Sequence, residues 1–336
     1  MAGITLAQLM QVTKDPMKKY IGMQLLRESK LLNILPFENV SGLNVKAYWW
    51  KKLPTGAGFR SMNEGYDSYE DGQLGDGNES VYGFGGDVTY DGILEQIKDV
   101  IGDPVRMQVD ARLQSMAITW NNHFINGDVA TEPKGFNGLK KRVAAMDTRQ
   151  TIWAAGSSAA PMDPTGSAAL ARRWFNMFNK AIRYTNKGNV SAILMNENMQ
   201  IGVGIILSYI QGVGNYLAVT KDQYGREEVS YKGIPFVDPG LMQDQTTEII
   251  PETEVAGDGG TDSTSIYFCS FNTKDGVYGI QLNQFKAYDP LNGGEMESKP
   301  AKLRRVDWWN GIASFGRHGI TRIRNIERLA DWTEGV

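Results

Sequence analysis

Cysteine and histidine are nearly absent from this chain of 336 residues. It has one cysteine, Cys269, and two histidines, His123 and His318. A lone cysteine cannot form an intrachain disulfide or a thiolate zinc cluster, and neither histidine stands in a paired metal-binding spacing. The sequence therefore argues against a disulfide scaffold and a metalloenzyme. Cys269 lies in the apolar run SIYFCSF, so we expect it to be a small buried side chain in a protein of a reducing compartment.

The sequence also lacks long hydrophobic runs and a basic excess. No segment approaches the roughly 18 consecutive apolar residues of a membrane span, and the start MAGITLAQLM lacks the regions of a secretory signal. Lys and Arg number 35 against 38 Asp and Glu, a formal charge of −3. A charge of this sign does not drive binding to phosphates, which argues against a transcription factor. We expect a protein without a membrane partner that is made in the cytoplasm.

Motifs that carry catalysis or bind nucleotides are missing too. GDGGTDST lacks the order of a phosphate-binding loop, the glycines of GVGIILSYIQGVG fall inside or after a predicted helix, and no serine stands in a nucleophile elbow. His123 follows an apolar stripe at a helix end, where packing or capping is more common than proton transfer. We therefore predict that the protein is not an enzyme and that it has no catalytic residue, cofactor or metal site.

An acidic, glycine-rich segment separates two predicted strands. Leu43 to Trp50 alternates with period two, and so does SVYGFGGDVTY, where Tyr82, Phe84, Val88 and Tyr90 share a face. We expect these two strands to pair as a long hairpin. The connection carries six carboxylates and no Lys or Arg over its second half, namely Glu64, Asp67, Glu70, Asp71, Asp76 and Glu79. Their spacing does not match an EF-hand, so the segment is interpreted as solvated or facing a partner.

A long helix is predicted over 104–125, after the start signal IGDP. Its apolar stripe recurs every three or four residues, and Asn126-Gly127 is suited to a left-handed helix stop. Two short amphipathic helices are expected within 4–35. They form either an ordinary N-terminal helix pair or an arm that lies on a neighbouring chain.

The remainder alternates helices and strands, which indicates an α+β or α/β unit. Helices are predicted in PTGSAALARRWFNMFNKAIRYTNKG and NENMQIGVGIILSYIQG, the second capped by Asn196 or Asn198. Strands are predicted in VSAILMN, EVSYKGIPFVDPG, SIYFCSF, GVYGIQL and the final segment. That final segment is basic. Between Lys299 and Arg328 it has two Lys and six Arg against Asp307 and Glu327.

The order of these elements resembles the major capsid protein of tailed bacteriophages, the Hong Kong 97-type fold that encapsulins share. HFINGDVATEPKGFNGL, residues 123–139, is similar to the family's helix end followed by Asn-Gly-Asp and Pro-x-Gly-x-x-Gly-Leu, and FRSMNEGYDSY is similar to the tip of its hairpin. The resemblance implies an N-terminal arm (1–42), an E-loop hairpin (43–92), a spine helix with part of a P-domain (93–139), an A-domain (140–250), and remaining A-domain strands with the C-terminal P-domain (251–336).

The same resemblance implies a virion protein, assembled in the host cytoplasm, whose pentamers and hexamers enclose double-stranded DNA without sequence-specific binding. The arm begins within a few residues of Met1, so we expect a separate scaffolding protein or none, together with a portal and, in some shells, a decoration protein. Lys51 and Lys52 lie in the hairpin, and no motif identifies a covalent crosslink.

The acidic hairpin and the basic C-terminal segment are complementary, so we predict that they form the contact between subunits. The residues are Glu64, Asp67, Glu70, Asp71, Arg304, Arg305, Arg322 and Arg324. Within one chain the same charges would give an intramolecular contact instead. Two other functions stay open: an encapsulin-like cellular shell, and an α+β enzyme with an acidic lid.

Overall fold

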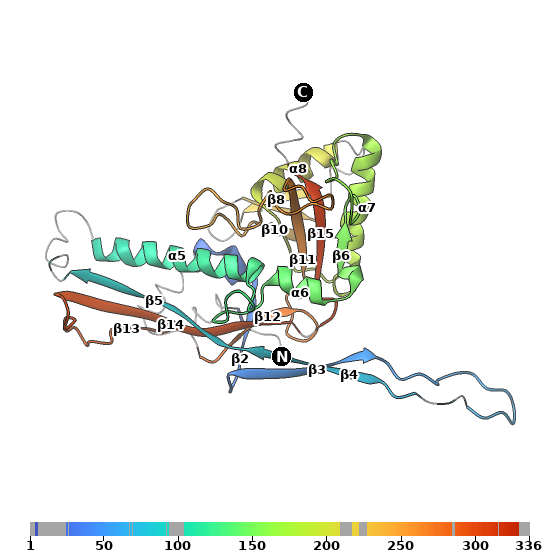
Figure 1. The fold of residues 1–336 in the computed structure, drawn as a ribbon, viewed down its shortest axis with the longest axis horizontal. Helices are drawn as coiled ribbons and strands as arrows, with labels where there is room; N and C mark the ends of the chain where they lie inside the picture. The colour runs from blue at the N-terminus through green and yellow to red at the C-terminus, as the bar shows by residue number, and fades with distance from the viewer. Residues whose placement is uncertain are drawn as a thin grey trace.

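The protein consists of two sheets joined by a long helix, with a hairpin that projects away from both (Figure 1). The structure is a computed structural model. It describes residues 4–5, 25, 27–66, 68, 70–91, 93, 104–208, 217–221, 227–283, 286–314 and 316–328.

The lower sheet has six strands in the order β1-β2-β12-β14-β13, and β5 pairs with the other edge of β14. Its strands are β1 (Ile4–Thr5), β2 (Pro36–Asn39), β5 (Tyr82–Asp91), β12 (Val277–Gln281), β13 (Lys286–Tyr288) and β14 (Ala301–Ser314). The pairing of β5 with β14 runs from Asp91–Ala301 to Tyr82–Asn310. These two strands form the extended arm at the left of Figure 1.

The upper sheet has seven strands in the order β6-β15-β11-β7-β10-β9-β8. They are β6 (Thr151–Trp153), β7 (Ala192–Leu194), β8 (Leu217–Lys221), β9 (Glu227–Tyr231), β10 (Ile234–Val237), β11 (Ser263–Cys269) and β15 (Ile320–Glu327). All seven residues of β11 are buried, because β11 lies inside the sheet and both of its faces are covered. Cys269 is among them, so its predicted burial is confirmed.

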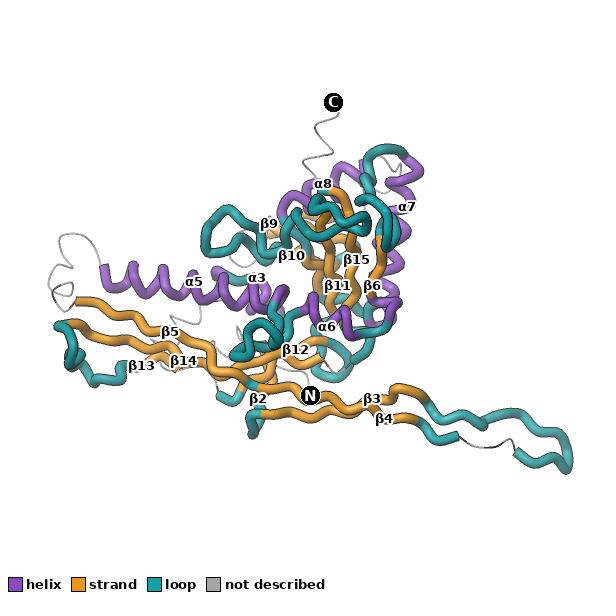
Figure 2. The backbone as a smooth tube through the Cα atoms, viewed as in Figure 1, coloured by secondary structure: helices purple, strands orange, loops and turns teal. Residues whose placement is uncertain are grey.

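Within the described residues, four α-helices longer than five residues pack on these sheets (Figure 2). They are α5 (Pro104–Asn126), α6 (Leu139–Ala145), α7 (Ala168–Tyr184) and α8 (Glu197–Ser208). The short helix α3 (Lys30–Ile34) is capped by Ser29, whose Oγ accepts a hydrogen bond from the Leu32 N–H. The predicted helices over 104–125, PTGSAAL… and NENMQ… are confirmed, and Asn196 Oδ1 caps α8 by accepting from the Met199 N–H at 2.9 Å.

The buried stripe of α5 joins the two sheets. Its residues pack with side chains of β12 and β14 below and with one face of β7 and β11 above. The opposite face of the upper sheet packs against α7 and α8 in a second core. Adjacent residues alternate between the two cores, as Leu194 and Ile193 do, because successive side chains of a strand point to opposite faces. The sheets and α5 are therefore held by shared apolar contacts.

The predicted strand pairing of the hairpin is wrong. β3 (Asn44–Lys52) pairs with β4 (Gln73–Ser80), and β5 pairs with β14. Tyr82 and Phe84 of β5 contribute to the main core, so this strand belongs to the body. β4 reads QLGDGNES and gave no sequence signal, because its side chains cover no core and need no apolar alternation.

Two smaller expectations also fail. Ile4–Thr5 is a strand beside Pro36–Phe37, although a helix was predicted from residue 4; most of the predicted helix pair lies outside the described residues. Gly127 does not adopt a positive φ. It is needed for space, because a Cβ there would lie 2.5 Å from His123 O and 2.6 Å from Phe136 O.

Gly127→Ala is therefore expected to lower the free energy of unfolding by about 1–3 kcal/mol through overpacking. Gly204 of α8 is the matched control, because a Cβ there meets no atom within 4 Å. Gly204→Ala should stabilise the protein by about 0.5–1 kcal/mol through helix propensity. Urea unfolding of both variants checks this, and equal effects of the same sign would contradict it.

Candidate assembly surfaces

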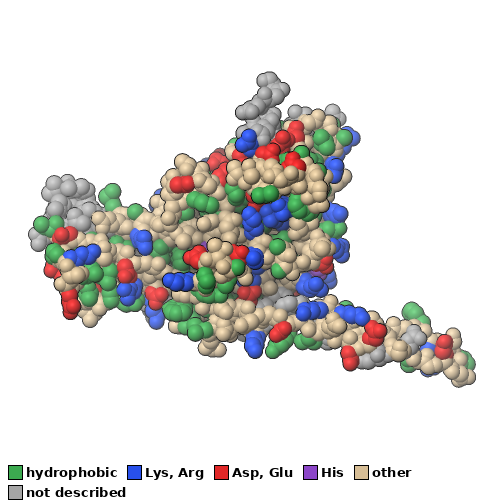
Figure 3. Space-filling view, in the orientation of Figure 1, with side chains coloured by type: hydrophobic (Ala, Val, Ile, Leu, Met, Phe, Trp, Pro, Cys, Tyr) green, Lys and Arg blue, Asp and Glu red, His purple; other side chains and the backbone are tan. Residues whose placement is uncertain are grey.

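The projecting hairpin exposes apolar side chains that no described residue of the chain covers. Figure 3 shows hydrophobic, basic and acidic groups mixed along it. Phe59 and Met62 near its tip are 110% and 93% exposed relative to the reference state. The exposed large apolar residues of the hairpin are Tyr48, Leu53, Phe59, Met62, Tyr66 and Leu74. Such a set is typical of a surface that a partner covers.

The tip carboxylates make their contacts within the hairpin. Glu70 pairs with Lys52 at 2.8 Å, and Glu64 accepts a hydrogen bond from the Ser61 N–H at 3.0 Å. Asp71 is exposed, and Asp67 lies outside the described residues. The tip points away from the body in Figure 1, so the described tip residues do not reach the basic segment of their own chain. The intramolecular contact considered from sequence is not present for them.

The base of the hairpin is anchored by a partly buried ion pair that the sequence did not reveal. Glu79 of β4 accepts two hydrogen bonds from the guanidinium of Arg142 in α6, the second at 2.9 Å. Arg142 also donates to Asn137 O at 2.7 Å and Ile312 O at 2.8 Å. It therefore ties the hairpin to α6 and to the lower sheet. Arg142 stands three residues after the buried Leu139, a spacing that puts both residues on one helix face. This spacing is the sequence feature that could have predicted a buried Arg142.

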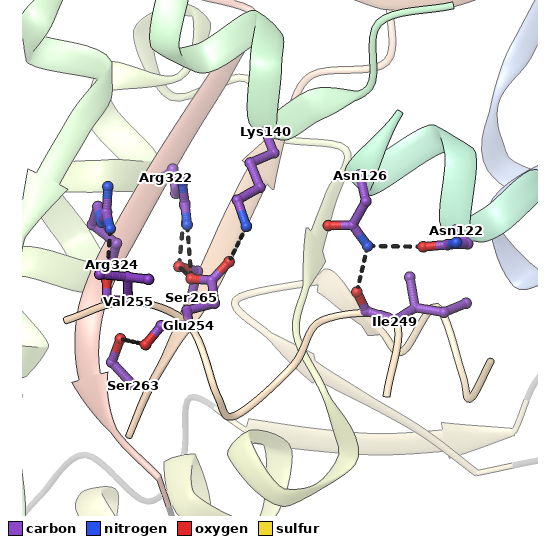
Figure 4. Close-up of polar contacts among 10 residues, drawn as sticks. All are labelled: Asn122, Asn126, Lys140, Ile249, Glu254, Val255, Ser263, Ser265, Arg322 and Arg324. Atoms are coloured by element: carbon purple, nitrogen blue, oxygen red, sulfur yellow. Dashed lines mark hydrogen bonds and ion pairs between the residues drawn. The ribbon is translucent and has the colours of Figure 1, made fainter. Parts of the chain in front are cut away.

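Arg322 is not a surface residue. It is 5% exposed, and its guanidinium donates to Glu254 Oε2 at 2.7 Å and to Ser265 Oγ at 3.0 Å (Figure 4). Lys140 of α6 reaches the other oxygen of Glu254 at 3.3 Å. Burial alone would raise the pKa of Glu254, but Arg322 and Lys140 hold that pKa below its usual range. The polar, glycine-rich segment around Glu254 gave no sequence signal for a buried carboxylate.

The other three predicted arginines are divided between two strands, Arg304 and Arg305 on β14 of the lower sheet and Arg324 beside Arg322 on β15 of the upper sheet. Arg305 pairs with Asp87 of β5 at 2.7 Å, with both side chains 42% exposed, and this contact lowers the pKa of Asp87. Arg324 donates to Val255 O at 2.8 Å and stacks over Trp153 with 4.1 Å to the ring centre. Arg304 is partly exposed on β14. The structure does not bring the four arginines into one patch.

A group of carboxylates surrounds the start of α8. Asn196 donates to Glu248 Oε2 at 2.7 Å and to Glu252 Oε1 at 3.3 Å. The pKa of Glu248 is raised to about 7, mainly by burial and further by the carboxylates of Glu252, Asp238 and Glu197, while the hydrogen bond from Asn196 opposes the shift. The native state therefore holds a proton that the unfolded chain releases near pH 4.5.

Stability is accordingly expected to fall as pH rises from about 4.5 to about 7, because the folded state binds more protons there. Glu248→Gln removes this titration, so the variant should lose less stability than the wild type between pH 5 and pH 8. Thermal unfolding at both pH values measures the difference. Glu227→Gln, at an exposed position of β9, should leave the profile unchanged. Parallel profiles for wild type and Glu248→Gln would contradict the expectation.

The predicted packing role of His123 is confirmed. Its ring meets Phe136 edge-on at 4.8 Å between centres, and Gly135 leaves the space the ring occupies, since a Cβ there would lie 2.1 Å from Nε2. Across the described residues, no cluster of three or more His, Cys, Asp or Glu could hold a metal ion. Within that same part of the chain, no helix is both long and apolar enough to cross a membrane.

Comparison with known proteins shows which solved structures share this fold. No family model and no curated protein sequence matches the chain. A chain of the holo-SrpI encapsulin complex from Synechococcus elongatus PCC 7942 matches with a TM-score of 0.58 at 12% identity, covering 89% of this chain and 87% of that one. The capsid of a native GTA particle matches with a TM-score of 0.58 at 14% identity, covering 89% and 90%. A chain from Mycobacterium phage Bobi matches with a TM-score of 0.55 at 10% identity, covering 88% and 89%.

The predicted α+β, Hong Kong 97-type fold is thereby confirmed, over nearly the whole length of both chains in each comparison. The names and boundaries of the domains within it stay predictions.

Proposed function

We propose that this protein is the major capsid protein of a tailed bacteriophage, and that its pentamers and hexamers form an icosahedral or elongated shell around double-stranded DNA. The observation that carries the proposal is the projecting hairpin, whose apolar side chains are exposed and covered by no described residue, on a fold shared with shell proteins over 89% of the chain's length. The role is structural rather than enzymatic.

Association with further copies follows from the shape of the chain. The hairpin leaves the body, so the surface that covers it belongs to another molecule. A projecting element that fits a different surface on the next copy makes a heterologous contact, and such contacts generate rings when the rotation closes. Contacts that are weak singly become stable when many are made at once. Exposed apolar groups on the hairpin are thus suited to a closed assembly.

The proposed contents and partners rest on charge and on the likeness to shells. With a net charge of −3 the protein would hold DNA by enclosure rather than by phosphate binding. The virion would also contain a portal. A separate scaffolding protein would act during assembly in the host cytoplasm. Some shells of this type would also carry a decoration protein.

The direct test is to express the protein, alone and with its neighbouring head genes, and to examine it by size-exclusion chromatography and negative-stain microscopy. We expect rings of five or six subunits and closed shells. A stable monomer under every condition would contradict the proposal.

An encapsulin-like shell is the second candidate, because the encapsulin of Synechococcus elongatus PCC 7942 and the GTA capsid match with the same TM-score of 0.58. The contents of purified particles separate the two. Nuclease-protected DNA supports the phage capsid, and a protein cargo without DNA supports the encapsulin-like shell.

Reversing the tip charges should weaken assembly in a salt-dependent way. The variant carries Lys at the positions of Glu64, Asp67, Glu70 and Asp71. Its yield of shells is expected to fall most at about 0.01 M salt and less at about 1 M, because the Debye length shortens from about 30 Å to about 3 Å. Light scattering during assembly measures this. An unchanged yield at low salt would exclude the tip as an electrostatic contact.

A further inference from the structure

A pocket of about 410 Å³ lies along the part of the hairpin nearest the body, between β3 and β4 on one side and α6 and the end of β14 on the other. We call it the hairpin-base pocket. Its volume lies within the range of about 300–1,000 Å³ that is usual for small-molecule sites, so it has room for more than a single ion. Its polar lining residues include Lys51, Glu79, Lys141, Arg142, Ser314 and Arg317.

Half of these polar groups satisfy one another. Each nitrogen of the Arg142 guanidinium already donates a hydrogen bond, to Glu79 or to the backbone oxygens of Asn137 and Ile312. Lys141 pairs with Asp128 at 2.8 Å. Arg142, Glu79 and Lys141 therefore shape the pocket and leave its charge to the other two cations.

Those two cations, Lys51 and Arg317, have no carboxylate partner within the described part of the chain. Both are exposed, and Arg317 Nη1 donates to Lys51 O at 3.4 Å, so its guanidinium lies against the hairpin strand. The pKa of Asp147 is lowered first by the Arg149 N–H and further by Arg317, so Asp147 offsets part of the charge from outside the pocket. The hairpin-base pocket is thus positively charged.

One hydroxyl of the pocket lacks a partner. Ser314 Oγ is buried and has no hydrogen bond to any described residue. A buried hydroxyl without a partner costs about 1–3 kcal/mol, so a ligand oxygen that enters the pocket would relieve this cost. Ser314 stands three residues before Arg317, at most about 10 Å away along the chain, so one small ligand can reach both.

We infer that the hairpin-base pocket binds a phosphate group, carried by a small molecule or by a nucleic-acid strand. The planar fork of an arginine and the point charge of a lysine are the two side chains suited to phosphate, and Arg317 and Lys51 supply one of each. A phosphate has enough acceptor oxygens to meet both cations and a hydroxyl. Ala145 and Met146 give the pocket an apolar wall for the group that carries the phosphate.

A bound phosphate would brace the hairpin. It would join Lys51 of β3 to Arg317, which follows β14, and so add a second link between hairpin and body beside the pair of Glu79 with Arg142. The net charge of −3 belongs to the chain as a whole and does not prevent a local site with two unpaired cations. The inference does not rest on the proposed function, because one chain contains all of the residues that it uses.

Thermal unfolding in sodium phosphate, against sodium chloride of equal ionic strength, tests the site. A ligand that binds only the folded state raises the midpoint, so the wild type should unfold at a higher temperature in phosphate. Lys51→Gln with Arg317→Gln should weaken phosphate binding at least about tenfold, because it removes both charge-assisted contacts. Lys221→Gln, at an exposed position of β8, is the matched control and should bind as the wild type does.

The control also removes a general effect of phosphate. Phosphate stabilises folded proteins by being excluded from their surfaces, and that gain should be equal in all three proteins. A midpoint that phosphate does not raise in the wild type, or a rise that the double variant and Lys221→Gln share equally, overturns the inference.

Ser314→Ala tests the hydroxyl separately. Without phosphate the variant should be at least as stable as the wild type, because it removes a buried group that has no partner. With phosphate it should gain less than the wild type. A variant that is destabilised without phosphate and gains the full amount with it would overturn the part assigned to Ser314.

Two further probes separate the sources of the phosphate. If a labelled oligothymidine binds the double variant more weakly than the wild type, the pocket takes the phosphate of a nucleic-acid strand. If only inorganic phosphate and thymidine monophosphate do so, it takes a free small molecule; both results support the inference. No arm requires shells, so failure here leaves the proposed function intact, and a protein that binds phosphate without forming shells counts against the proposed function alone.

Discussion

Replacing Glu254 by alanine is expected to lower the free energy of unfolding by about 3–5 kcal/mol, the cost of leaving a buried charge uncompensated. Arg322 is 5% exposed and directs its guanidinium at Glu254 Oε2 at 2.7 Å, so without this carboxylate it has no acidic partner there. Ser265 would also lose the acceptor of its hydroxyl. Chemical unfolding in urea at neutral pH measures the loss.

Two controls isolate the buried charge as the cause. Arg305→Ala breaks the ion pair with Asp87, whose partners are each 42% exposed, and should cost about 0–1 kcal/mol. The double variant Glu254→Leu with Arg322→Met removes both charges and should be more stable than Glu254→Ala, because apolar groups of similar size often replace a buried pair without loss. If Glu254→Ala costs no more than Arg305→Ala, the buried pair does not stabilise the fold.

The same pair predicts the response to acid. Because the pKa of Glu254 is held below its usual range in the folded state, its contribution is present above the pKa of the unfolded carboxyl and is lost as pH falls through the folded pKa. Glu254→Ala should therefore lose less stability on acidification than the wild type does.

Shortening the hairpin is expected to abolish shells while leaving the body folded. Replacing residues 53–72 by Asn-Gly joins Lys52 to Gln73, which face each other at the end of the β3–β4 pairing. A two-residue Asn-Gly loop is a favoured hairpin turn, so the remaining strands should still pair. The removed segment includes Phe59, Met62 and Tyr66, which are exposed and pack against no core. The thermal midpoint should change little, and shells should be absent by electron microscopy.

A variant whose hairpin keeps its full length tests whether the apolar side chains, rather than the length of the hairpin, drive assembly. In this control Phe59, Met62 and Tyr66 become Ser, while the backbone length stays the same. It should also fail to form shells if burial of apolar groups drives the contact, since each large side chain contributes about 1.5–3 kcal/mol when covered. Normal shells from the shortened protein would show that the hairpin is not an assembly element.

The local elements of the fold could be predicted because their residues carry the pattern of burial themselves. The stripe of α5, with Leu113, Trp120 and Phe124 at helical spacing, identified a helix packed on a core, and the structure buries all three. The uninterrupted apolar run around Cys269 likewise indicated an interior strand. The order of such elements along the chain was sufficient to predict the shell fold.

Pairing partners and charge partners were decided only by the tertiary structure. β4 has no apolar alternation, so nothing in its sequence distinguishes a strand from a loop, and it forms because β3 offers a free edge. Composition likewise placed Arg305 and Arg322 in one basic segment. In the fold their side chains lie in different environments. Arg305 is partly exposed to solvent on β14, and Arg322 is buried in the upper sheet.

The sequence by itself thus determined which segments are helices and interior strands, that the chain has an acidic projecting segment, and which fold it adopts. The tertiary structure decided which strand closes the hairpin, and that Arg142 and Arg322 are buried structural cations rather than surface charges. The physical reason is that local burial patterns depend on neighbours a few residues apart. The energy of an ion pair or a strand pairing depends on groups brought together from distant parts of the chain, as Glu79 and Arg142 are.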